Sequence, residues 1–178
     1  MTEANESVVL LSRALDQAGD VLTAIREDQL TLPTPCGDWD VARLIAHVVA
    51  TPANFVTLST GGEVDWAAEP APAGHDYAAR FRSGADDLIH FWHQAGDSAR
   101  PEQLSWQLAE LAVHTWDLAR ATGQTPQLDP EVAERGLAFM SASLTPENRG
   151  DAFGAEVQVP EDAPAYDRIA AFAGRDPS

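Results

Sequence analysis

Residues 102–123 read EQLSWQLAELAVHTWDLARATG, and a mostly apolar set of residues recurs in it at every third or fourth position. This apolar stripe consists of Leu104, Leu108, Leu111, Thr115 and Leu118. That spacing places its members on one face of an α-helix. Gly123 follows at a position where glycine commonly ends a helix. The stretch therefore predicts a helix of about five to six turns with one buried face.

Three further stretches upstream have the same periodicity. They begin near residues 6, 41 and 76, and the first and third extend to about residues 29 and 95. Pro52 lies inside the second stretch, where we expect a kink rather than the end of the helix. Residues 61–76 are rich in glycine, proline and alanine and predict a loop of a length that is often functional. Four amphipathic helices with short or medium connections predict an all-α four-helix bundle over about residues 5–123.

The pattern changes in the last third of the chain. Residues 130–143 predict a shorter helix, residues 153–160 alternate like a brief extended segment, and residues 163–174 predict a terminal helix. We expect this extension, about residues 124–178, to pack onto the bundle. At 178 residues the chain has the length of one domain, so residues 1–178 are interpreted as a single domain.

The charge of the chain argues against several classes of partner. Lysine is absent, and 11 arginines stand against 28 acidic residues, for a formal net charge of -17. The arginines are scattered singly, so we expect no nucleic acid and no membrane as partner. The long uncharged stretch 44–62 contains histidine, proline, asparagine and threonines, and we expect it not to span a bilayer. The N-terminus does not resemble a secretory signal and Cys36 is the single cysteine, which together favour a cytoplasmic location.

Three side chains form a candidate metal site. Glu110 and His114 lie within about 40° of each other on a helical wheel and flank the buried stripe. His47 lies at the edge of the apolar stripe of the helix that begins near residue 41. Two histidines and one carboxylate from facing helices are the ligand set of a zinc site with an open fourth position. The alternative is that each histidine is a hydrogen-bonded core residue and that the pocket holds no metal.

Asp117 follows His114 by three positions on the same flank of the helix. A carboxylate there can orient a ligand histidine from behind, as a second-shell residue. The alternative is an ordinary polar residue paired with Arg43 or Arg120. The remaining histidines are interpreted as surface residues, and three of the tryptophans as packing anchors. These are His75, His90 and His93, and Trp39, Trp106 and Trp116.

Several of these stretches resemble a known family. TPCGDWDV (34–41), LIAH (44–47) and ELAVHTWDLARATG (110–123) are similar to the metal-binding domain of mycothiol-dependent maleylpyruvate isomerases, a branch of the DinB-like four-helix bundles. FGAEVQVP (153–160), DR (167–168) and GRDP (174–177) resemble the ending of a short single-domain group in that superfamily. The resemblance thus covers nearly the whole chain and implies a DinB-like fold. It also implies that the zinc ligands of the family correspond to His47, Glu110 and His114.

The resemblance further implies a chemistry. The isomerase carries a separate C-terminal domain, for which the roughly fifty residues after Gly123 leave no room, so we expect a stand-alone bundle. In it, Zn²⁺ or another divalent metal would activate a thiol such as mycothiol for attack on an electrophilic substrate, as in thiol-dependent transferases and isomerases. The expected partners are that thiol and that electrophile. We expect the chain to be a monomer or a homodimer. The alternatives are a metal-dependent hydrolase that uses activated water and a non-catalytic metal- or ligand-binding bundle.

Overall fold

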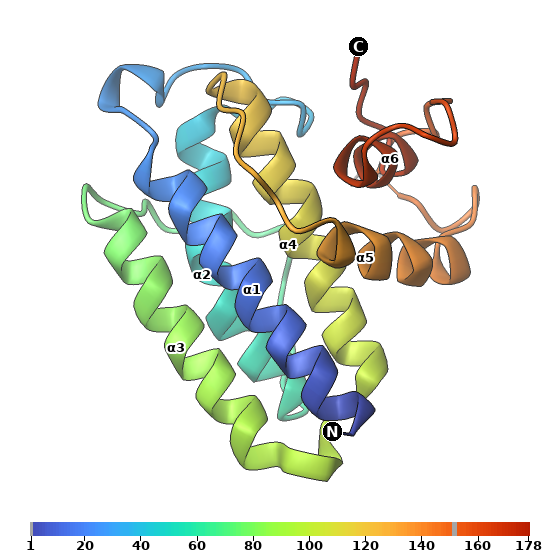
Figure 1. Ribbon diagram of the computed structural model, residues 1–178. Coiled ribbons are helices and arrows are strands. Elements are labelled where there is room, and N and C mark those ends of the chain that lie inside the picture. Colours follow the sequence, from blue (N-terminus) through green and yellow to red (C-terminus); the bar gives the residue numbers. More distant parts are fainter. Residues whose placement is uncertain (1, 151–152) are drawn as a thin grey trace.

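The computed structural model describes residues 2–150 and 153–178, which are helical with no strand in these two ranges (Figure 1). The α-helices are α1 (Glu3–Thr23), α2 (Val41–Ser59), α3 (Tyr77–Ala95), α4 (Pro101–Ala121), α5 (Pro130–Ser143) and α6 (Ala165–Phe172). Two short 3-10 turns, Glu27–Gln29 and Gly96–Ser98, follow α1 and α3. The predicted all-α, DinB-like class is confirmed.

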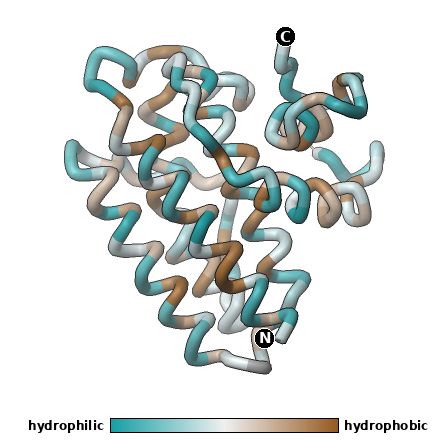
Figure 2. Tube along the Cα trace, viewed as in Figure 1, coloured by the Kyte–Doolittle hydropathy of each residue, from teal (hydrophilic) through white to brown (hydrophobic). Residues whose placement is uncertain are grey.

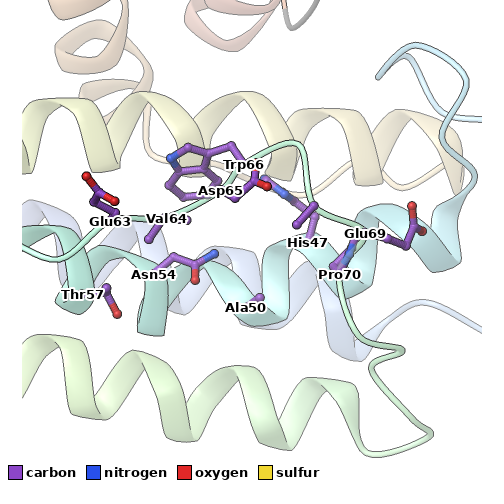
Figure 3. A pocket seen from close by; sticks show the side chains of 11 residues that line it. His47, Ala50, Asn54, Thr57, Glu63, Val64, Asp65, Trp66, Glu69 and Pro70 are labelled. Atoms are coloured by element: carbon purple, nitrogen blue, oxygen red, sulfur yellow. The ribbon is translucent and has the colours of Figure 1, made fainter.

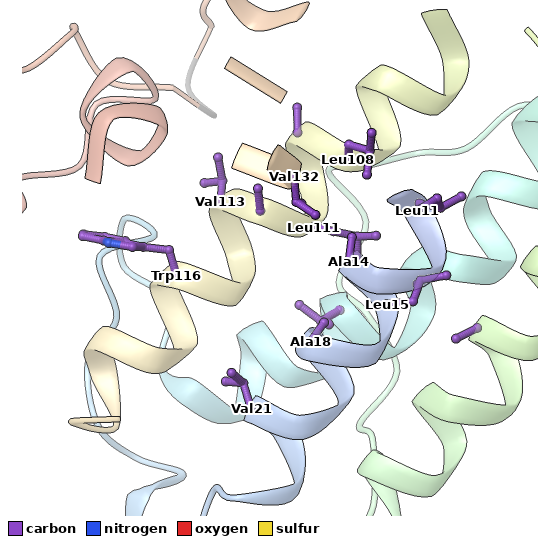
Figure 4. Close-up of a cluster of buried hydrophobic side chains, with 14 of the residues drawn as sticks. Leu11, Ala14, Leu15, Ala18, Val21, Leu108, Leu111, Val113, Trp116 and Val132 are labelled. Carbon is purple, nitrogen blue, oxygen red and sulfur yellow. The ribbon is translucent and has the colours of Figure 1, made fainter. Parts of the chain in front are cut away.

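Helices α1 to α4 form the bundle. α1 packs against α3 and α4, and α2 packs against the same two helices from the other side. Figure 2 shows hydrophobic and hydrophilic residues alternating along these helices, and Figure 4 shows side chains of α1 facing those of α4 and α5. The predicted stripes are buried, and their fully buried members include Leu11, Leu22, Leu44, Phe81, Leu88, Leu104 and Leu108. The spacing of apolar residues therefore accounts for which face of each helix points inward.

The start of α2 is fixed by a local cap. The side chain of Asp40 accepts a hydrogen bond of 2.9 Å from the backbone N–H of Arg43, which satisfies one of the free donors of the first turn. An antiparallel bridge between Pro33 and Asp40 closes the turn that leads into the helix. The helix continues through Pro52 to Ser59, as expected. His47 is thereby held near the middle of a long, continuous helix.

By length and composition alone, α2 is apolar enough to cross a membrane, which the polar residues of 44–62 led us not to expect. Those polar residues are too few to bring the mean hydropathy of the helix below that of a membrane-spanning helix. Half of its apolar window is buried inside the protein, where α2 packs on α3 and α4. Core helices of folded domains meet the same criteria, because they are apolar for packing.

The C-terminal extension covers one side of the bundle. α5 packs along α4 and α1, and α6 packs on α5 and α4 (Figure 1). Gly136 allows α5 to approach α4 closely, because a Cβ atom there would lie 2.9 Å from the Cα of Ala109. The predicted extended segment, residues 153–160, is neither helix nor strand. Its attachment to α6 is a bond of 2.9 Å from the N–H of Val157 to the carbonyl of Ala171.

Two helices are shorter than predicted. The first ends at Thr23 rather than near Gln29, and the chain turns there through the 3-10 turn. The side chain of Gln29 accepts from the N–H of Arg26 and donates to the carbonyl of Thr122, so it ties this turn to the end of α4. α6 begins after Pro164 and ends before Gly174, which has a φ of 90°.

Candidate metal centre

The three predicted metal ligands meet between α2 and α4. Nε2 of His47 lies 2.7 Å from Oε1 of Glu110, and Nε2 of His114 lies 3.1 Å from the same oxygen. The three donor atoms all lie within 4.8 Å of one another. The imidazole rings are close as well, with centroids 4.8 Å apart. One carboxylate oxygen thus stands between two imidazole nitrogens from different helices.

The charges and hydrogen bonds within this group outweigh the effect of its burial on the pKa values of its members. The side chains of His47 and His114 are each 11% exposed and that of Glu110 is 16% exposed. Burial alone would raise the pKa of Glu110, but the charge and hydrogen bonds of His114 and the hydrogen bond of His47 hold it well below its ordinary value. Burial alone would lower the pKa of His114, but the Glu110 carboxylate, with the hydrogen bond to Asp117, raises it well above its ordinary value. Both shifts favour the charged form, and they therefore favour an ion pair between Glu110 and His114 when no metal is bound.

The stability of the metal-free protein is expected to depend on pH through this pair. The lowered pKa of Glu110 stabilises the fold above its ordinary value of 4.5, and the stabilisation is lost as the pH falls toward the lowered pKa. The raised pKa of His114 stabilises the fold below 6.5, and this is lost as the pH rises through the raised pKa. Between these values we expect the metal-free protein to exceed its Glu110→Gln variant in free energy of unfolding by on the order of 2 kcal/mol.

Urea unfolding of both metal-free proteins across a pH series measures this difference. It should be largest between pH 4.5 and 6.5 and should shrink as the solution becomes more alkaline. A difference that stays constant from acid to alkaline pH would show that the pair does not titrate with folding.

The other ring nitrogen of His114 contacts Asp117, which forms a buried ion pair with Arg175. Nδ1 of His114 lies 3.1 Å from Oδ2 of Asp117, whose side chain is fully buried. The carboxylate of Asp117 also accepts from Arg175, with Nε to Oδ1 at 3.2 Å and Nη2 to Oδ2 at 3.0 Å. The partner of Asp117 is therefore Arg175, rather than Arg43 or Arg120 as the alternative from the sequence supposed. Arg43 instead bonds Glu69 at 2.7 Å.

Cys36 belongs to a second group of potential donors, with His114 and Asp117, whose donor atoms also lie within 4.8 Å of one another. The carboxylate of Asp117 in this group is already engaged by Arg175. A metal there would have to displace that buried ion pair, which is costly. In the group of His47, Glu110 and His114, the donor atoms contact one another, and a metal would replace these contacts without breaking the bonds between Asp117 and Arg175.

A cavity of about 370 Å³ adjoins His47. Its wall comes from α2 and from the loop that connects α2 to α3, as Figure 3 shows. Trp66 of this loop lies against His47, with ring centroids 5.8 Å apart, and against Trp106 at 5.6 Å. Trp39 approaches His47 from another side at 5.2 Å. The loop predicted from its composition thus brings an indole ring to the candidate site.

The other histidines lie away from this site on the surface. His75, His90 and His93 are exposed, as expected, and His90 lies beside Gln94. Sequence reasoning missed Trp66, Cys36 and Arg175 as neighbours of the site. Cys36 and Arg175 lie in the family-like stretches 34–41 and 174–177, but these stretches and the loop of Trp66 have no periodicity that would place them beside the site.

A four-helix bundle with two histidines and a buried glutamate converging between its helices defines a candidate metal-binding helical protein. Residues 11–119 match the family described as "Mycothiol maleylpyruvate isomerase N-terminal domain". The chain belongs to this family, which is part of the DinB-like superfamily. The family indicates a mycothiol-related metal-binding domain.

Relatives extend the match to almost the whole chain. Two proteins of Mycobacterium tuberculosis, "Uncharacterized protein MT0763" of strain CDC 1551 / Oshkosh and "Uncharacterized protein Rv0738" of strain H37Rv, are each 36% identical to it over 182 residues. The alignment covers 92% of this chain and 94% of each relative. No solved structure matches the chain significantly.

Proposed function

We propose that His47, Glu110 and His114 hold one zinc ion, and that the protein uses it to activate a low-molecular-weight thiol of the mycothiol type for attack on an electrophilic substrate. The observation that carries this proposal is the convergence of three donors next to a cavity. His47 belongs to both, since its Nε2 faces Glu110 and its side chain lines the cavity of about 370 Å³. A small molecule in that space would lie against one of the three proposed metal ligands.

The donor set fits zinc in number and in spacing. Two ligands of a tetrahedral zinc ion with bonds of about 2.0–2.1 Å are about 3.3 Å apart. The two nitrogen-to-oxygen distances are 2.7 and 3.1 Å, so these two pairs need to separate by about 0.2–0.6 Å, and the two nitrogens, which lie within 4.8 Å of each other, need to reach the same spacing. Two imidazoles and one carboxylate are a ligand set of catalytic zinc sites, which keep a further position open.

A zinc ion in this place would lower the pKa of a thiol that binds to it, so that the thiolate persists at neutral pH. The residues of the chain supply the rest. Asp117 accepts from Nδ1 of His114 and so leaves Nε2 directed at the site. Trp39 and Trp66 lie against the ring of His47 and restrict its orientation. Asn54 and Thr57 in the cavity wall offer hydrogen bonds to the polar groups of a thiol or its substrate.

The thiol can be tested by spectroscopy on the Co²⁺-substituted protein. We expect added low-molecular-weight thiols to produce a thiolate-to-cobalt charge-transfer absorption that saturates at about one thiol per metal, because one position is open. The matched control is the alcohol in which oxygen replaces the thiol sulfur, which should produce no such band.

Two results would contradict the thiol proposal. One is a protein that binds Co²⁺ but shows no charge-transfer band with any thiol. The other is turnover of electrophilic esters or amides at the same rate with and without thiol, which would instead assign the site to hydrolysis by activated water.

A further inference from the structure

We propose that Arg175, in the C-terminal tail, is a positioning residue of the metal centre that fixes Asp117 and, through Asp117, the ring of His114. The inference rests on the metal centre of the proposed function and not on its thiol. Arg175 lies outside residues 11–119, the part of the chain that matches the family. The tail would then be a working part of the site rather than a cover for the bundle.

Arg175 and Asp117 form a two-pronged ion pair. The guanidinium of Arg175 meets both oxygens of the Asp117 carboxylate, at 3.2 and 3.0 Å. A planar fork that bonds both oxygens sets the plane of the carboxylate as well as its place. Oδ2, which takes the shorter of these bonds, is also the oxygen 3.1 Å from Nδ1 of His114. Arg175 therefore determines the direction from which Asp117 accepts the histidine proton.

Both members of this ion pair are buried. The side chain of Asp117 is 0% exposed and that of Arg175 is 5% exposed. Water is thus excluded from Asp117, and the protein itself supplies the partners of this carboxylate. Without Arg175, the buried carboxylate would have to turn toward other donors or admit water. Either change would release Nδ1 of His114 from its present partner.

The backbone after α6 holds Arg175 in this place. The backbone N–H of Arg175 donates to the carbonyl of Ala170 at 2.9 Å, which closes the end of α6. Gly174 makes the turn with a φ of 90°, and a Cβ atom there would lie 2.5 Å from the Cα of Gly154. Nη1 of Arg175 donates to the carbonyl of Ala173 at 2.9 Å, so the third nitrogen of the guanidinium is held as well.

α4 contacts the C-terminal part of the chain, α6 and the residues after it, at two other points. Nε1 of Trp116 donates to Oδ1 of Asp167 at 2.9 Å, and Arg120 donates to the carbonyl of Pro177. Arg120 therefore anchors the tail to the helix without being one of the hydrogen-bond partners of Asp117. It is a matched control, because its loss weakens the docking of the tail and leaves the bonds between Arg175 and Asp117 in place.

The test compares zinc affinity, by competition with a chromophoric chelator, in wild type and in Arg175→Lys, Arg175→Gln and Arg120→Gln. We expect the two Arg175 variants to bind zinc about tenfold or more weakly, the effect typical of losing an outer partner of a ligand histidine. Arg120→Gln should bind zinc within about twofold of wild type. Lysine keeps the charge but lacks the fork, so Arg175→Lys decides the matter if Arg175→Gln does not fold.

A second measurement separates positioning from general stability. In zinc-loaded protein, the Nδ1 proton of His114 should give a slowly exchanging NMR signal in wild type and in Arg120→Gln, and should exchange faster in the Arg175 variants. Wild-type zinc affinity in folded Arg175→Lys, or an equal loss in Arg120→Gln, would overturn the role of Arg175. If wild type itself binds no zinc, the proposed metal centre is what fails, whereas a missing thiol band with normal zinc binding leaves Arg175 unaffected.

Discussion

Replacing His114 with alanine is expected to lower the affinity for zinc by at least about a hundredfold, since loss of a mere outer partner already costs 10–100-fold. The variant loses one of the three proposed donors and also releases Asp117 from its bond to the ring. His47→Ala should have an effect of the same size. Elemental analysis of protein purified without a histidine-containing tag checks this, with about one zinc per chain expected in wild type and little in either variant.

Two substitutions serve as controls for that result. His90→Ala removes an exposed histidine away from the site and should leave the zinc content unchanged. Cys36→Ser tests the second group of donors and should also keep its zinc, because the carboxylate of that group is held by Arg175. Full zinc content in His47→Ala or in His114→Ala would remove that residue from the site. Loss of zinc in Cys36→Ser would instead assign the metal to the group that contains Cys36.

The second large effect is on stability. Asp117→Leu leaves the guanidinium of Arg175 buried without its counter-charge, and we expect the free energy of unfolding of the metal-free protein to fall by about 3–5 kcal/mol. The prediction follows from the burial of both side chains and the two hydrogen bonds that join them. Urea unfolding followed by circular dichroism measures the change.

The double variant Asp117→Leu with Arg175→Met provides the matched comparison. Replacing both members of a buried ion pair with apolar residues is often close to neutral, so most of the lost stability should return. A single Asp117→Leu variant within about 1 kcal/mol of wild type would mean that Arg175 reaches water or another partner when Asp117 is absent. In that case the pair does not hold the tail on α4.

The fold could be predicted from the sequence because its signal is local. The burial of Leu44, Phe81 and Leu108 follows from their spacing alone, and α5 runs from Pro130 to Ser143 as predicted. The errors fall where local and tertiary effects compete. After Thr23 the apolar pattern continues, but a 3-10 turn tied by Gln29 to the end of α4 replaces the helix.

The candidate site could be predicted only in part. His47 is 63 residues from Glu110, yet both lie at the edge of a buried stripe, so the bundle brings them together. Their role as metal ligands stays a prediction. Arg175 is 58 residues from Asp117 and reaches it through a glycine turn in the tail, a path that no periodicity describes.

X-ray absorption spectroscopy of the zinc-loaded protein tests the metal centre most directly, because it counts the atoms around the ion. Without thiol, the account predicts two imidazole rings and only nitrogen or oxygen at about 2.0–2.2 Å. With thiol added, one sulfur should appear at about 2.3 Å. A sulfur in the thiol-free protein, or fewer than two imidazoles around the metal, would contradict the assignment of His47, Glu110 and His114.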